Sequence, residues 1–303
     1  MTIRFDNRVA IVTGSGAGLG RSHALLLASR GAKVVVNDPG GAVDGRGDAQ
    51  AVADKVVAEI NAAGGEAVAS YDSVADFASA QRIVETAMDA WGRVDILVNN
   101  AGILRDKAFN NMGMADYEFV NQVHHFGTVY CTKAVWPVMR KQQYGRVVVT
   151  TSGSGTVGNF GQANYGAAKM AVNGLINVLR FEGAKYNIRI NAISPSALTR
   201  MTESLLPPDV APWMKPELVS PAVAWLCSEE CDQNGEIIAA TAGGYARVQY
   251  FISEGMQFDP AEPVTIEMIA ESIDRIRDMS NSRPYTGLMG NVAEKLREMG
   301  RIK

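Results

Sequence analysis

The sequence predicts an α/β protein whose parallel, doubly wound sheet has about seven strands and is followed by a C-terminal helical appendage. Two observations support this fold class. Short apolar, β-branched runs recur without alternating with polar residues, which is typical of strands buried on both faces. Longer helical stretches separate these runs, so strand and helix alternate along the chain. The predicted strands are Val9–Thr13, Lys33–Asn37, Glu66–Ser70, Ile96–Asn99, Arg146–Thr151, Ile188–Ile193 and Glu236–Ala239.

The predicted helices between these strands include Arg21–Arg30, Asp48–Ala63 and Ala75–Trp91. Because parallel strands need crossover connections of this length, the helices should cover both faces of the sheet.

The composition changes near Gly255, and this divides the chain into a main domain, residues 1–254, and an appendage, residues 255–303. The appendage is too short to be expected to fold alone, so we expect it to pack on the main domain. Its isoleucines have the spacing of one amphipathic helix, with Thr265 as the N-cap. These are Ile266, Ile269, Ile273 and Ile276.

The bulk composition excludes several classes of partner. The net charge of the 303 residues is −3, which gives no reason to expect nucleic acid or an anionic membrane surface. No apolar run is long enough to span a bilayer. We see no secretory signal at the start and no peroxisomal tripeptide at the end, so the sequence favours a cytoplasmic protein.

The cysteine count, three, is odd and low, which suits a reducing compartment. We interpret these residues as small buried side chains rather than metal ligands, because no histidine has zinc-site spacing with them. The cysteines are Cys131, Cys227 and Cys231, and the histidines are His23, His124 and His125.

A glycine-rich turn follows the first strand and opens the first helix. Its residues run Gly14-Ser15-Gly16-Ala17-Gly18-Leu19-Gly20. In such a turn Gly14 permits the tight bend, Gly18 lets backbone amides approach a pyrophosphate, and Gly20 lets the helix lie close to the strand. The position at the first strand–helix junction is the context that a dinucleotide-binding turn requires.

An acidic residue ends the second strand. Asp38 lies eighteen positions after Gly20. A carboxylate there accepts hydrogen bonds from the ribose hydroxyls of an adenosine and repels a 2′-phosphate. We therefore predict NAD rather than NADP as the cofactor. The other interpretation is that Asp38 only begins the turn into Pro39.

The pentad Tyr165-Gly-Ala-Ala-Lys169 carries the predicted chemistry. On a helix, Tyr165 and Lys169 share a face. A nearby lysine ammonium, together with the positive charge of the nicotinamide, favours the phenolate, so Tyr165 could take a proton from an alcohol while hydride leaves for the nicotinamide. Lys169 can also hydrogen-bond the nicotinamide ribose. Ser152, at the end of the fifth predicted strand, could hold the substrate oxygen beside Tyr165.

Two loops are candidates for the rim of this site. The Gly-rich segment from Pro39 to Asp48 either borders the cofactor or is a mobile surface loop. The segment Ala197–Pro216 is expected to form a substrate lid, or to pack on the appendage or on a partner subunit. Its apolar residues suit an acyl chain: Met201, Leu205, Leu206, Pro207, Pro208, Trp213 and Met214.

Taken together, these motifs resemble those of the short-chain dehydrogenase/reductase family over roughly residues 5 to 250. The matching elements are Thr13-Gly-x-x-x-Gly-x-Gly20, Asn99-Asn-Ala-Gly102, Ser152 and Tyr165-x-x-x-Lys169. The resemblance implies a Rossmann-like sheet, hydride transfer between NAD(P) and an alcohol or carbonyl, and a homodimer or homotetramer. The subunits would meet through the helix of Tyr165 and residues near 115 to 140.

Within this family the chain is most similar to the (3R)-hydroxyacyl-CoA dehydrogenase part of peroxisomal multifunctional enzymes. That similarity rests on Val36-Asn-Asp-Pro-Gly-Gly41, Asn100-Ala-Gly-Ile-Leu-Arg-Asp106, Gly158-Asn-Phe-Gly-Gln-Ala-Asn-Tyr165 and Ala224-Trp-Leu-Cys227. It implies a small-molecule substrate of the acyl-CoA type. It also implies NAD contacts from Ser15, Asp72, Ser73, Asn99 and the segment Ala197–Arg200, which includes Thr199.

The sequence departs from the family pattern at three positions. His124 stands where many members have an asparagine that completes a proton relay with Lys169. It either takes part in the chemistry or is a packed core histidine. Ser196 replaces the usual glycine after Pro195, and Arg200 replaces a usual threonine. We therefore expect altered geometry beside the nicotinamide.

Three functions remain open on the sequence. The first is a dehydrogenase of (3R)-3-hydroxyacyl-CoA or a similar apolar secondary alcohol, with Arg105, Lys107 and Arg200 as candidates for contacts with the coenzyme A phosphates. The second is a steroid or other cyclic-alcohol dehydrogenase. The third is a dinucleotide-binding regulatory protein that has lost catalysis, against which the intact Ser152, Tyr165 and Lys169 argue.

Overall fold

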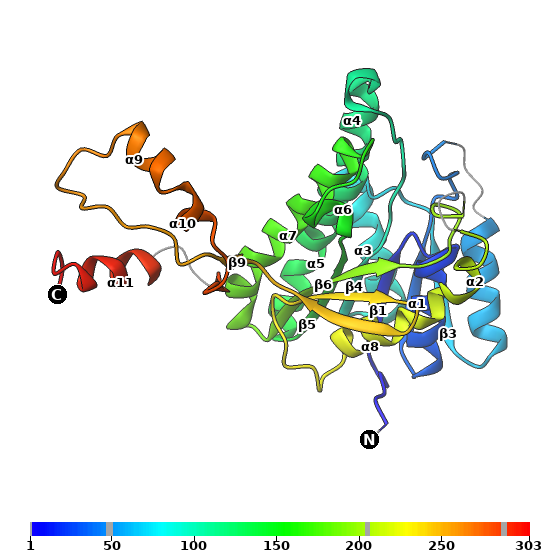
Figure 1. Cartoon of the computed structure of the whole chain (residues 1–303). Helices are drawn as coiled ribbons and strands as arrows, with labels where there is room; N and C mark the ends of the chain where they lie inside the picture. The colour runs from blue at the N-terminus through cyan, green and yellow to red at the C-terminus, as the bar shows by residue number, and fades with distance from the viewer. Residues whose placement is uncertain (1, 47–50, 204–206, 286–289) are drawn as a thin grey trace. The chain divides into compact units, whose positions relative to one another are not determined.

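A parallel sheet lies at the centre of the larger part of this computed structural model, which describes residues 2–46, 51–203, 207–285 and 290–303 (Figure 1). The strand order is β3-β2-β1-β4-β5-β6-β7-β8, and the pairs from β3 to β7 are all parallel. The strands are β1 (Val9–Thr13), β2 (Lys33–Asn37), β3 (Glu66–Ser70), β4 (Ile96–Asn99), β5 (Gly145–Thr150), β6 (Ile188–Ser196), β7 (Ile237–Thr241) and β8 (Gly244–Val248). The predicted doubly wound sheet is confirmed.

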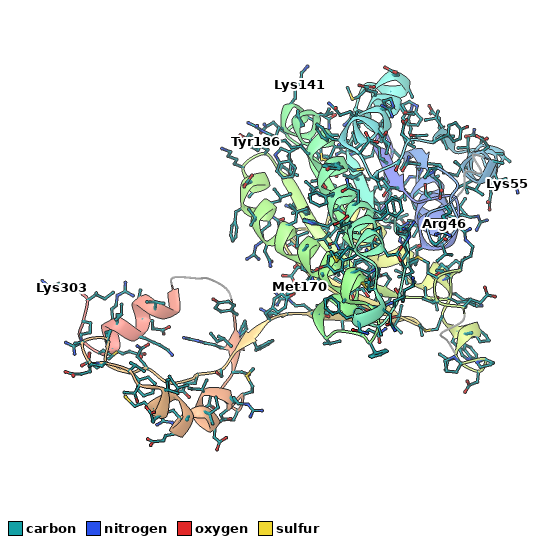
Figure 2. All side chains as sticks on the ribbon, turned by 90° about the horizontal axis from the view of Figure 1, so that it is seen from above. Arg46, Lys55, Lys141, Met170, Tyr186 and Lys303 are labelled. Carbon is teal, nitrogen blue, oxygen red and sulfur yellow. The ribbon has the colours of Figure 1, made fainter. Side chains whose placement is uncertain are left out.

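Helices cover the sheet in two layers. One layer contains α1 and α8, which pack on each other, and the other contains α3, α5 and α7. The bounds are α1 (Gly18–Ser29), α2 (Ala51–Ala62), α3 (Phe77–Trp91), α4 (Met114–Asn121), α5 (Gly127–Gln142), α6 (Gly153–Thr156), α7 (Ala163–Ala184) and α8 (Ser220–Cys227). Figure 2 shows Arg46 and Lys55 on one side of this unit and Lys141 and Tyr186 on the other. Residues 48–50 of the predicted second helix lie outside the described residues.

The sheet changes direction between β1 and β4, because the chain builds outward from β1 to β3 and then returns to β4 on the other side. In open α/β sheets, ligands bind at the carboxyl ends of the strands on either side of this switch point. The core beneath it is apolar: Ile11, Val35 and Leu97 lie opposite one another on β1, β2 and β4 and have no exposed surface. Rigid, buried strands therefore carry the loops that make the site.

The eighth strand, β8, was not predicted. Ala242 and Gly243 connect it to β7, and both have positive φ, at 48° and 83°. A two-residue turn of this kind can join only antiparallel strands. The sheet therefore ends on an antiparallel hairpin after seven parallel strands.

The chain divides into two compact units, Met1–Arg247 and Val248–Lys303, so the division falls seven residues before the predicted boundary. The second unit contains β9 (Phe251–Ile252) paired antiparallel with β10 (Arg283–Pro284), and the helices α9 (Ile266–Glu271), α10 (Ile273–Arg277) and α11 (Gly290–Glu298). The expected packing of this segment on the main domain stays a prediction.

The single helix predicted from Ile266 to Ile276 is wrong. The backbone leaves the helical range at Ser272, with φ −98° and ψ 0°, and separates α9 from α10. The predicted N-cap is confirmed, because the Thr265 hydroxyl accepts a hydrogen bond from the Met268 amide at 3.3 Å. The spacing of the isoleucines does not predict this break, because it takes no account of the serine between them, a residue that favours helix ends.

Two further expectations, drawn from the composition, concern the cysteines and membrane-spanning segments. Cys131, Cys227 and Cys231 are free thiols and all three are buried, as expected of small core residues. Within the described ranges no helix is long and apolar enough to cross a lipid bilayer.

A buried histidine fastens α1 to α8. The Nδ1 atom of His23 lies 2.8 Å from the Ser220 hydroxyl, which also bonds the Ser22 hydroxyl at 2.7 Å. Burial lowers the pKa of His23 to about 3. His23 therefore takes up a proton near pH 6.5 in the unfolded chain, but only near pH 3 in the folded chain.

This difference predicts acid sensitivity. Because the unfolded state binds the extra proton, the free energy of unfolding should fall as the pH drops below about 6.5, by about 2 kcal/mol between pH 7 and pH 5 for His23. His23→Gln should remove this part of the pH dependence of the free energy of unfolding, measured by urea unfolding at the two pH values. His125→Gln is the control, since its partly exposed ring should contribute less. Equal slopes in His23→Gln and wild type would contradict the prediction.

Candidate active site

A cavity of about 540 Å³ opens at the carboxyl ends of the strands, where the sheet changes direction. It joins the glycine turn on one side to the Ser152–Tyr165–Lys169 group on the other. Most of the predicted site residues line it: Gly14, Gly18, Leu19, Asp38, Ser73, Ser152, Tyr165, Lys169, Ala197 and Thr199. The structure thus brings together residues that are separated by up to 185 positions in the sequence.

Four predicted cofactor residues do not line the cavity. The Ser15 hydroxyl is buried and donates to the Val12 carbonyl at 2.7 Å. The Asp72 carboxylate pairs with Arg82 at 2.6 Å. Asn99 is buried, and its side-chain amide donates to Thr132 at 3.1 Å. The fourth residue, Gly20, packs closely against the Gly14 carbonyl.

The glycine turn has the close approaches that the sequence predicts. Gly14 has φ +62°, and a Cβ there would lie 2.7 Å from the Cα of Ala101. A Cβ on Gly20 would lie 2.2 Å from the Gly14 carbonyl oxygen. Helix α1 begins at Gly18 and its N-cap, Ala17, has no side chain to cap the first amides. These amides therefore suit an anion such as a pyrophosphate, which fits a dinucleotide.

A group of hydrogen bonds made by the Thr13 and Asn100 side chains, which we call the polar knot, joins the ends of β1 and β4. The Asn100 side-chain amide donates to the carbonyls of Thr13 and Gly14, both at 3.0 Å. In return, the Thr13 hydroxyl accepts from the amides of Asn100 and Ala101, at 3.0 and 3.1 Å. Asn100 also lines the cavity. The knot, and not Asn99, is therefore what fixes the glycine turn against the fourth strand.

The Asp38 carboxylate is tied to the backbone on both sides. One oxygen accepts from the Gly16 amide at 2.9 Å and the other from the Gly40 amide at 2.7 Å. Asp38 lines the cavity at the same time. The carboxylate thus faces the cavity and also holds the glycine turn against the loop that follows β2.

That loop closes over one side of the cavity. We call residues 42–46 the strap. The Val43 carbonyl accepts from the Leu104 amide at 3.0 Å, and the Asp44 carbonyl accepts from Arg105 Nε at 3.0 Å. Ala42, Val43 and Gly45 line the cavity. Of the two interpretations of this segment, the structure therefore supports the one in which it borders the site.

Arg105 clamps the strap. Besides its bond to Asp44, its guanidinium pairs with Asp116 at 3.0 Å and lies 4.4 Å from the Phe119 ring centroid. Arg105 is thus bound within the fold on three sides, and this speaks against the predicted contact with a coenzyme A phosphate. Arg200, which is exposed and lines the cavity, keeps that candidacy.

The orientation of Ser152 follows from helix capping. Ser152 is the N-cap of α6, and its hydroxyl oxygen accepts from the Ser154 amide at 3.2 Å. The amide uses only one acceptor lone pair, so the hydroxyl proton can still turn toward Tyr165 or toward a group in the cavity. A substrate oxygen placed there would accept it.

Burial dominates the electrostatics of Tyr165 and Lys169. It raises the pKa of Tyr165, the hydrogen bond from Ser152 lowers it, and the charge of Asp106 raises it. Burial also lowers the pKa of Lys169 to about 7. Lys169 Nζ donates to the Thr150 carbonyl at 2.5 Å and lies 5.5 Å from the Tyr165 ring centroid. The lysine alone therefore does not favour the phenolate, which leaves that effect to the second charge expected from the sequence, that of the nicotinamide.

The sequence reasoning missed a polar cluster beside Ser152. Gln162 donates to Asp106 at 2.7 Å and accepts from Ser154 at 2.7 Å and from Asn159 at 3.1 Å. Ser154, Asn159 and Gln162 line the cavity. Their only signal in the sequence was the segment before Tyr165, which carried the family resemblance. Their partner Asp106 lies on a different loop.

The predicted lid is partly described. Met201 and Met214 line the cavity, whereas Trp213 is 71% exposed. Leu205 and Leu206 lie outside the described residues. The structure explains the tolerance for Ser196 in place of glycine, because β6 continues to that residue and pairs it with Thr241 of β7. Extended backbone does not require glycine.

The model of the short chain dehydrogenase family matches residues 8–208, about two thirds of the chain. The chain belongs to this family. It is therefore an oxidoreductase by descent. The match covers the glycine turn, the Asn99–Gly102 segment and the Ser152–Tyr165–Lys169 group.

Named relatives narrow the comparison. The chain is 49% identical over 306 residues to peroxisomal multifunctional enzyme type 2 of Drosophila melanogaster, covering 98% of this chain and 51% of that enzyme. The solved structure of the full-length Drosophila enzyme matches with a TM-score of 0.82 at 42% identity, covering 98% of this chain and 50% of that one. This chain thus spans about half the length of that relative.

Two further solved structures cover most of both chains. A short chain dehydrogenase from Mycobacterium avium matches with a TM-score of 0.79 at 39% identity, over 90% of this chain and 97% of that one. A 7α-hydroxysteroid dehydrogenase complexed with NADH and 7-oxo glycochenodeoxycholic acid matches with a TM-score of 0.72 at 31% identity, over 80% and 95%.

The clamp on the strap can be tested by proteolysis. Arg105→Lys should free the strap, because an ammonium cannot hold the Asp44 carbonyl and Asp116 together in the way a guanidinium does. Trypsin should then cut after the exposed Arg46 several-fold faster, as followed by mass spectrometry. Arg21→Lys, which alters an exposed pair with Glu59, is the control. An unchanged rate of cleavage after Arg46 would show that Arg105 does not hold the strap.

Proposed function

We propose that this chain is an NAD-dependent dehydrogenase that moves a hydride between a secondary alcohol and its ketone, with a (3R)-3-hydroxyacyl-CoA or a similar apolar substrate. The observation that carries the proposal is the single cavity that joins the glycine turn and Asp38 to Ser152, Tyr165 and Lys169. The similarity to peroxisomal multifunctional enzyme type 2 supports the substrate class.

In this proposal each side chain has one role. Ser152 donates its hydroxyl proton to the substrate oxygen and holds it beside Tyr165. Tyr165 takes the alcohol proton as the carbon–hydrogen bond gives up its hydride, and it returns that proton when a ketone is reduced. Lys169, fixed by the Thr150 carbonyl, keeps further N–H donors for a ribose hydroxyl. When bound, NAD supplies the hydride acceptor and a positive charge.

That positive charge matters because the protein alone holds the pKa of Tyr165 above its usual value. A cation beside the phenol favours the phenolate and opposes the effect of burial. The proton transfer is thereby coupled to cofactor binding. Without the cofactor, Tyr165 stays protonated at neutral pH.

The apolar side of the cavity supports an acyl or other apolar substrate. Met201 and Met214 line it, and methionine adapts to irregular apolar groups. The alternative substrate class, a steroid or other cyclic alcohol, is favoured by the similarity to the 7α-hydroxysteroid dehydrogenase. A panel of (3R)-3-hydroxyacyl-CoA thioesters and cyclic alcohols, followed by the absorbance of NADH, separates the two.

Tyr165→Phe tests the proton transfer. It should lower kcat by about 10²- to 10⁴-fold, the usual contribution of a general acid–base, and leave the Kd of NAD within about twofold, the scatter expected of a removed hydroxyl that NAD does not need. Tyr186→Phe is the matched control, since Tyr186 lies on the outer side of the unit (Figure 2). If wild type binds NAD but turns over no alcohol, the non-catalytic regulatory protein becomes the better description.

Asp38 tests the cofactor preference. NAD should bind wild type at least about tenfold more tightly than NADP, since a 2′-phosphate would meet the carboxylate. Asp38→Ala should narrow the gap, because it removes both the acceptor for the ribose hydroxyls of NAD and the charge that repels a 2′-phosphate. Asp44→Ala, in the strap, is the control. Equal affinities for the two cofactors in wild type would refute the assignment.

We also propose a homodimer or homotetramer built through α5 and α7. Helix α7 carries three apolar side chains on its outer face, Met170, Val178 and Phe181, which are 43%, 54% and 70% exposed. Figure 2 labels Met170 on this helix. Exposed apolar residues grouped on one helix are typical of subunit contacts. Sedimentation of the full chain measures the state directly.

The location remains a choice between two proposals. The sequence favours the cytoplasm, whereas several relatives carry the word peroxisomal in their names. The cytoplasmic expectation therefore has no support from these relatives. Imaging of the tagged full chain beside a peroxisomal marker distinguishes the two.

A further inference from the structure

His124 lies in an irregular turn that interrupts a long helical stretch. The chain runs as α4 to Asn121, then as the π turn η2 (Gln122–Phe126), and then as α5 from Gly127. A single π turn inside a helix inserts extra backbone and is frequent at functional sites. Here the turn carries the His124 ring into the fold, where it is 2% exposed and lines the cavity.

The ring is tethered to the loop after β4. His124 Nε2 lies 2.8 Å from the carbonyl oxygen of Ile103 and 3.0 Å from its amide nitrogen. A neutral imidazole can donate to the first or accept from the second. Because both groups belong to Ile103, the tether holds in either tautomer.

A glycine makes room for this ring. A Cβ on Gly102 would lie 2.3 Å from His124 Cε1 and 3.1 Å from Nδ1. Since a contact shorter than 3.0 Å does not occur, the ring could not stay in place beside any other residue at this position. Gly102 and His124 are therefore a matched pair.

On its other side the ring meets Tyr165. The two ring centroids are 5.0 Å apart and the planes make an angle of 89°. Edge-to-face contact of this kind is the preferred arrangement of two aromatic rings. Burial and the charge of Lys169 hold the pKa of His124 well below its usual value, so the ring stays neutral. No hydrogen bond joins His124 to Lys169 in the part of the chain that the structure describes.

We propose that His124 is a positioning residue for the reaction: its ring, tethered to Ile103 and seated on Gly102, holds the Tyr165 phenol in line with the substrate oxygen. This inference rests on the proposed function and assigns to His124 a different role from that of a proton relay. It also links the catalytic tyrosine to the loop of Ile103 and Leu104, which binds the strap.

Three variants separate the parts of this arrangement. His124→Phe keeps an aromatic ring but loses the tether to Ile103. His124→Gln keeps a donor and an acceptor for Ile103 but loses the ring. Gly102→Ala leaves His124 intact and displaces it from the opposite side. Gly113→Ala is the matched control, because a Cβ there would meet nothing within 4 Å.

Each of the three should lower kcat by about 10- to 100-fold, the cost of a misaligned reacting group, while the Kd of NAD stays within about twofold. The primary deuterium isotope effect on kcat should rise, since hydride transfer becomes slower. A residue needed only for stability would lower the melting temperature and leave kcat and the isotope effect of the folded enzyme unchanged. That result in His124→Phe and His124→Gln would overturn the proposal.

A second measurement does not depend on activity. Tyrosine labelled with ¹³C at the ζ carbon gives one NMR signal for Tyr165, identified by its loss in Tyr165→Phe. This signal should shift in all three variants and not in Gly113→Ala. If wild type oxidises no alcohol, the proposed function fails while this signal still tests the contact. An unmoved signal in His124→Phe and His124→Gln overturns the positioning role itself.

Discussion

The polar knot between Thr13 and Asn100 is the constraint on which the site depends. Four hydrogen bonds of 3.0 to 3.1 Å hold the ends of β1 and β4 together at the point where the sheet changes direction. The glycine turn leaves from one of these strands, and the loop to Ile103 leaves from the other. The distance between the dinucleotide side and the catalytic side of the cavity is therefore set by side-chain-to-backbone hydrogen bonds at the ends of two buried strands, and loop motion cannot easily change it.

The charges of the site follow from its depth. Lys169 and His124 are buried, and burial lowers the pKa of each, which favours the neutral form. Burial raises the pKa of Tyr165, which favours the neutral, protonated phenol. Without a bound ligand, His124 and Tyr165 are therefore neutral near pH 7, and Lys169, whose pKa is about 7, is only partly charged. Charge arrives with the ligands, and the chemistry is confined to the complex in which it is useful.

The sequence could predict what is local and could not predict what joins distant segments. Strands β1 to β4 begin and end where their apolar runs do, because burial on both faces leaves a clear signal. The positions of Ser152 and Tyr165 followed from motif spacing. The contact that holds the strap escaped prediction, since Arg105 lies about sixty residues further along the chain. The family resemblance implies a contact from Asn99, whereas its neighbour Asn100 lines the cavity, because the sequence does not tell which of two adjacent amides faces it.

The same limit explains the histidine and the appendage. A histidine in a helical stretch has no signal that would show a π turn or an aromatic neighbour forty-one positions away. Isoleucine spacing from Ile266 to Ile276 gave one helix, and a single serine made two. The unpredicted contact of the histidine and the division of the helix both arise where one residue's local preference or tertiary contact overrides the periodic pattern.

The fit of His124 against Gly102 also has a consequence for how this protein can change over generations. A side chain at position 102 would displace the ring, and a smaller residue at position 124 would leave a gap beneath the glycine. The effects of the two substitutions are therefore not additive, since each alters the space available to the other. Among descendants of this chain the two positions should be exchanged together, and an intermediate carrying only one change should be the rarer form.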